Sequence, residues 1–156
     1  FQGDADAALH AALEGTARGQ ALQSPFITAV GAMRQGHARL LDEAADSTEE
    51  AIVCFRRAIT IADELAVPRL KVEAFWGLCH AHGFSGNLSA AEAAAAQGIA
   101  IAYQTGDEWV TALIRLALAG SYVLARRYDE AAPLLAETAA AFAECRDTFG
   151  ETATRL

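Results

Sequence analysis

The chain has 156 residues, 53% of them hydrophobic, and a formal net charge of −8 at pH 7. This length is typical of one compact unit that buries a core without a disulfide or a metal ion. The acidic balance argues against a nucleic-acid binder, and no apolar stretch approaches the ~20 residues of a membrane span. Alanine is abundant and only 3 residues are proline, which favours helices because alanine is the best helix former and proline the worst.

The N-terminus begins with Phe1-Gln2-Gly3, which matches the residues that a common protease-cleavage tag leaves behind. We therefore treat residues 1–3 as a tag remnant. Residues 4–24 are expected to form an N-terminal helix and a connector, with a short helix over 4–15 and the connector over 15–24.

Hydrophobic periodicity and capping residues predict a series of helices after this connector. Ser24 followed by Pro25 is typical of a helix start, and Ser47 with Glu50 fits a capping box. Gly106 is expected to end one helix and Asp107 to cap the next. The predicted helices cover residues 25–45, 48–65, 69–84, 88–105, 108–126 and 128–145, and another starts near 148.

Several segments recur at a spacing of 40 residues. Glu49–Ile52, Ser89–Glu92 and Asp129–Ala132 form one series, and Gly106–Trp109 matches Arg146–Phe149. Helix pairs that cannot bury their apolar faces alone can do so by stacking. We therefore expect an all-α fold of antiparallel helix pairs stacked as an α-solenoid. Residues 25–156 form the array, with units at about 25–68, 69–108 and 109–148 and the start of a fourth at 149–156.

The same residues resemble the tetratricopeptide repeat. The third unit places Leu118-Ala119, Tyr122, Tyr128 and Ala131 at the offsets of that motif. The resemblance implies a right-handed tetratricopeptide-like solenoid, although its repeats are of about 40 residues rather than the usual ~34.

Longer repeats of this kind are similar to those of MalT-like, LuxR-type ATP-dependent bacterial transcriptional regulators. Ser24-Pro25-Phe26, Met33–His37 and Gly106–Trp109 carry this likeness. It implies a non-catalytic sensor or scaffold segment of a larger cytoplasmic regulator, and the unfinished fourth unit leads us to expect a longer natural protein. The alternative is a stand-alone adaptor. The chain has no phosphate-binding loop or basic recognition helix, so ATP binding and DNA binding are not expected of these residues.

We do not expect the cysteines and histidines to catalyse a reaction or to bind a metal ion. His80 and His82 lie two residues apart and would point to nearly opposite sides of a helix, whereas Cys79 and His82 would share a buried face. Cys54 and Cys145 are expected to be small core residues. Three widely spaced cysteines also favour a reducing, cytoplasmic location. We predict no catalytic residue, no metal and no cofactor.

The expected binding surface is the concave face, which the first helix of each tetratricopeptide unit lines. A protein or peptide partner, or a small-molecule effector, would bind there, next to neighbouring domains of the same chain and without direct contact to nucleic acid or membrane. The alternative is that Trp76 packs between units and the histidines only border the groove. Trp109 is expected to pack between units. The candidate groove residues are Met33, His37, Glu73, Trp76, His80 and Leu116.

Overall fold

The computed structural model describes residues 4–42 and 46–154, and within these ranges the protein is all-helical, as predicted, with no strand. The tag remnant 1–3 and the ends of two predicted segments, 43–45 and 155–156, lie outside the described residues. The helices are α1 (Ala5–Ala21), α2 (Pro25–Leu40), α3 (Ser47–Glu64), α4 (Pro68–Phe84), α5 (Leu88–Thr105), α6 (Glu108–Leu124), α7 (Tyr128–Glu144) and α8 (Thr148–Ala153).

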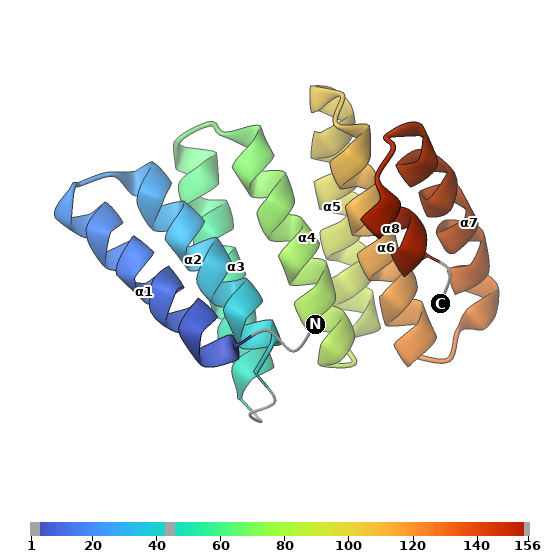
Figure 1. The fold of residues 1–156 in the computed structure, drawn as a ribbon, viewed down its shortest axis with the longest axis horizontal. Helices are drawn as coiled ribbons and strands as arrows, with labels where there is room; N and C mark the ends of the chain where they lie inside the picture. Colours follow the sequence, from blue (N-terminus) through green and yellow to red (C-terminus); the bar gives the residue numbers. More distant parts are fainter. Residues whose placement is uncertain (1–3, 43–45, 155–156) are drawn as a thin grey trace.

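From α1 to α7 the helices follow one another across the molecule broadly in the order of the sequence, with α3 behind α2, and α8 lies in front of α6 (Figure 1). Each packs against the next one along the chain, and short connections make consecutive helices antiparallel. In addition, α4 packs against both α2 and α6. The even-numbered helices α2, α4 and α6 are therefore neighbours, and together they present one face of the molecule.

From α4 onward the helices follow a fixed spacing. They begin at Pro68, Leu88, Glu108, Tyr128 and Thr148, which is one start every 20 residues. A left-handed residue precedes each start by two positions, with φ between 53° and 72°, at Ala66, Gly86, Gly106, Arg126 and Arg146. The amide that follows each of these residues donates to a carbonyl five residues earlier, as Asp107 does to Ala102 at 3.1 Å. The same Schellman-type turn thus ends each helix from α3 to α7.

The predicted helix ends are confirmed where local capping decides them. Ser24 accepts a hydrogen bond from the amide of Ile27, and Asp107 accepts one from the amide of Val110. The prediction of a capping box at Ser47 is wrong. Ser47 is the first residue of α3 and not its N-cap, and its hydroxyl donates to the Asp42 carboxylate at 2.7 Å.

The boundary predicted between the N-terminal helix and its connector is also wrong. Helix α1 continues through Gly15 and Gly19 to Ala21, so the connector is only three residues long. A Cβ atom at Gly19 would lie 2.6 Å from the backbone nitrogen of Thr28. The glycine therefore allows α1 and α2 to approach closely, and does not end the helix.

Small residues elsewhere serve the same purpose. Phe55 of α3 is fully buried, and its ring lies against Gly36 of α2 and Gly77 of α4. A Cβ atom at Gly77 would lie 2.2 Å from that ring. Most of the core residues around Phe55 are alanines of α2–α6, which explains how an alanine-rich chain fills a core.

Candidate binding surface

Four rings form a continuous stripe on the face made by the even-numbered helices. Trp76, His80 and Phe84 follow one another at i, i+4 and i+8 on α4, so they share one side of that helix. His37 of α2 extends the stripe. The ring centroids are 5.0 Å apart from His37 to Trp76, 5.6 Å from Trp76 to His80 and 6.0 Å from His80 to Phe84. We call these four residues the ring ladder.

Both imidazoles of the ring ladder are neutral at pH 7. Burial lowers the pKa of His37 to about 4, with smaller contributions from Arg34 and His80. Burial alone lowers the pKa of His80 to about 4. The buried Nε2 atom of His37 has no hydrogen-bond partner among residues 4–42 and 46–154. A buried polar atom of this kind is unusual in folded proteins and leaves hydrogen-bonding capacity unused.

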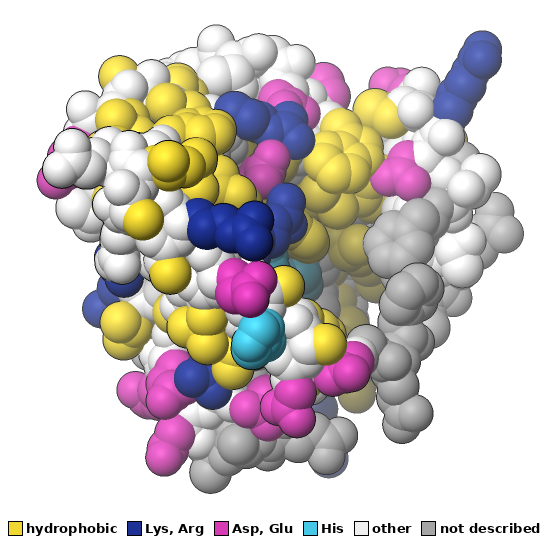
Figure 2. All heavy atoms as spheres, turned by 60° about the vertical axis from the view of Figure 1, so that its left-hand side comes forward, with side chains coloured by type: hydrophobic (Ala, Val, Ile, Leu, Met, Phe, Trp, Pro, Cys, Tyr) yellow, Lys and Arg dark blue, Asp and Glu magenta, His cyan; other side chains and the backbone are white. Residues whose placement is uncertain are grey.

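The ladder leads into a cavity of about 610 Å³, which we call the apolar groove. His80 and Phe84 of α4, Leu116 and Leu124 of α6, and Tyr128 and Leu135 of α7 line it, together with Ala153 of α8. Phe84, Leu124 and Tyr128 are 56%, 59% and 60% exposed. Figure 2 shows a hollow in the molecule in which hydrophobic side chains and a histidine are visible. Large apolar side chains gathered at a concave surface are typical of a binding site.

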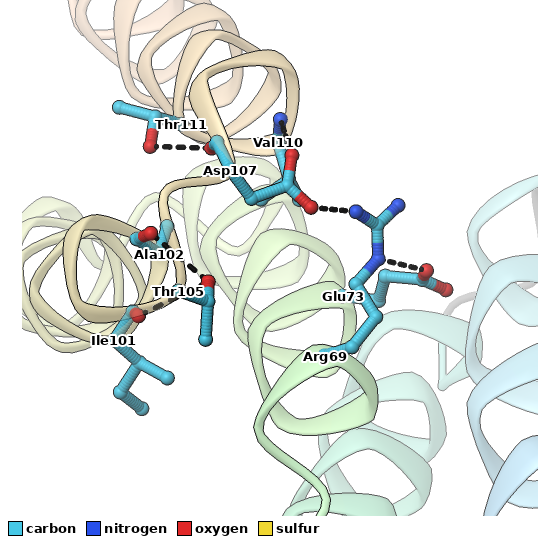
Figure 3. A network of polar contacts seen from close by, with 8 residues as sticks. All are labelled: Arg69, Glu73, Ile101, Ala102, Thr105, Asp107, Val110 and Thr111. Carbon is cyan, nitrogen blue, oxygen red and sulfur yellow. Dashed lines mark hydrogen bonds and ion pairs between the residues drawn. The ribbon is translucent and has the colours of Figure 1, made fainter.

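A polar network lies at the opposite end of α4 from Phe84. Arg69 donates to the Glu73 carboxylate at 2.8 Å and forms an ion pair with Asp107, the N-cap of α6 (Figure 3). The Arg69 guanidinium also lies 5.7 Å from the ring centroid of Trp109. The indole N–H of Trp109 in turn donates to Asp147 at 2.7 Å. The network therefore connects the starts of α4 and α6 with the turn before α8.

Five of the six predicted groove residues fall into three groups. The structure brings His37, Trp76 and His80 together in the ring ladder, and places Leu116 in the apolar groove next to His80. Glu73 lies in the polar network, where Arg69 binds its carboxylate.

Met33 does not belong to this surface. It is 1% exposed and packs among the core residues of α2–α6, so it cannot line an accessible groove. The 40-residue alignment placed it on the face of the other candidates, but the neighbouring helices of α2 cover this position.

Other residues of the surface were not predicted. Phe84, Val123, Leu124 and Tyr128 lie at helix ends and remain exposed in the structure. The spacing of four residues after Trp76 and His80 could have identified Phe84 in the sequence. No comparable pattern distinguishes the other three, because their role depends on how α6 and α7 meet.

The cysteines have no common role. Cys79 is buried, and burial raises the pKa of its thiol to about 12, which makes the thiolate unavailable at neutral pH. Cys54 is partly buried, as a core residue could be, but Cys145 is exposed just after α7, so its prediction as a core residue is wrong. Within the described ranges, no group of three or more His, Cys, Asp or Glu side chains is arranged to hold a metal ion.

Comparison with known proteins adds no relative. The chain matches no protein-family model, and no curated protein matches it. Among the described residues, the helices lack the length and apolar character that crossing a membrane requires.

Proposed function

We propose that the protein is a non-catalytic binding segment of tetratricopeptide-like architecture. Its antiparallel helix pairs stack as a right-handed α-solenoid with repeats of about 40 residues, twice the 20-residue spacing of the helix starts. The contact between Arg69 and Asp107 and the contact between Trp109 and Asp147 both span 38 residues and support this architecture. Equivalent positions in successive units would then make equivalent contacts.

The observation that carries the binding function is the continuity of the ring ladder with the apolar groove. His80 belongs to both, and it is a neutral imidazole among apolar side chains. A ligand can bury apolar groups against Phe84, Leu116 and Leu124 while a polar group meets the imidazole. Apolar burial supplies the affinity, and the hydrogen bond fixes the orientation.

The segment would act within a larger cytoplasmic bacterial transcriptional regulator, where binding changes how neighbouring modules pack. This context rests on the resemblance of Met33–His37 and Gly106–Trp109 to the repeats of MalT-like regulators. A stand-alone adaptor that binds a peptide or protein partner would use the same surface. The exposed apolar side chains of the groove favour a polypeptide partner in either case.

The proposal can be tested with a thermal-shift screen of sugars, nucleotides and peptides. A ligand present at 100 times its Kd stabilises the folded state by about 2.7 kcal/mol and should raise Tm by several degrees. The double variant Trp76→Phe/His80→Gln should abolish that shift. Val53→Ala, a change at an exposed apolar position on α3 outside both surfaces, should preserve it. An equal shift in both variants would contradict binding at the ring ladder.

A further inference from the structure

We draw no further inference here: the strongest candidate, the part of the apolar groove that lies between α6 and α7 and is bordered by Ala153 of α8, carries none because nothing in the structure shows what covers it.

Discussion

At the scale of single residues, the neutral histidines of the ring ladder make stability depend on pH. The pKa of His37 and that of His80 are about 4 in the folded protein, below the usual 6.5. Between these pH values the two histidines bind protons in the unfolded chain but not in the folded protein. Their contribution to the free energy of unfolding is therefore complete above pH 6.5 and is lost as the pH falls toward 4. Lowering the pH from 7 to 5 should cost about 2 kcal/mol for each histidine, measured by urea unfolding.

Variants isolate this contribution from that of the carboxylates. His37→Gln/His80→Gln should lose most of the pH dependence between 7 and 5, because its side chains no longer take up protons on unfolding. His10→Gln, at a side chain that is 76% exposed, should keep the slope of the parent protein. If all three proteins show the same slope, the two imidazoles are not the source of the pH dependence.

The sequence predicted which residues share one side of a helix better than it predicted which of them are buried. Helical spacing placed Trp76 and His80 on one side of α4, and the structure agrees. The same reasoning failed for Met33, because burial depends on which helices cover a position. Packing between helices that are distant in the sequence decides which helices cover a position, and a single sequence does not reveal this packing.

At the scale of helices, Asp107 combines two interactions that substitutions can separate. One carboxylate oxygen caps α6 at the amide of Val110, and the other pairs with Arg69 of α4. Asp107→Ala removes both interactions, whereas Asp107→Asn keeps the cap and removes the ion pair. The alanine variant should be about 1 kcal/mol less stable than the asparagine variant in urea unfolding. The asparagine variant itself should lose less than about 1 kcal/mol, because Arg69 is exposed to solvent.

Asn87 serves as a control for the capping interaction alone, because it caps α5 through the amide of Ala90 and is not part of an ion pair. Asn87→Ala should therefore cost about as much as the difference between the two Asp107 variants, about 1 kcal/mol. If Asp107→Asn is as destabilising as Asp107→Ala, the ion pair rather than the cap holds this helix start.

Helix boundaries were predictable where a local turn decides them. Gly106 with φ 68° and Asp107 lie at the end of α5 and the start of α6 that the sequence indicated. The end of α1 was not predictable in this way, because Gly15 and Gly19 have the composition of a connector. The close approach of Gly19 to Thr28 shows that the second glycine serves packing between helices, a property of the pair and not of either segment.

At the scale of the whole molecule, the core is unevenly distributed along the chain. One cluster of buried residues joins α2, α3, α4, α5 and α6, whereas α7 buries only Ala131, Thr138 and Phe142 among its described residues. Phe142 belongs to a separate small cluster with Ala112 and Leu113 of α6. The C-terminal helices are therefore coupled to the rest of the protein through few side chains, and they should open at a lower free energy than the centre.

Phe142→Ala tests this uneven coupling. The ring is fully buried and lies against Gly150 of α8, so its loss should cost about 3–5 kcal/mol of local stability. In hydrogen exchange followed by mass spectrometry, the amides of α7 and α8 should lose protection while those of α3, α4 and α5 keep it. Because these central helices bury their residues in the other cluster, they do not need Phe142 to stay folded. Parallel loss of protection along the whole chain would instead show that all the helices unfold as one cooperative unit.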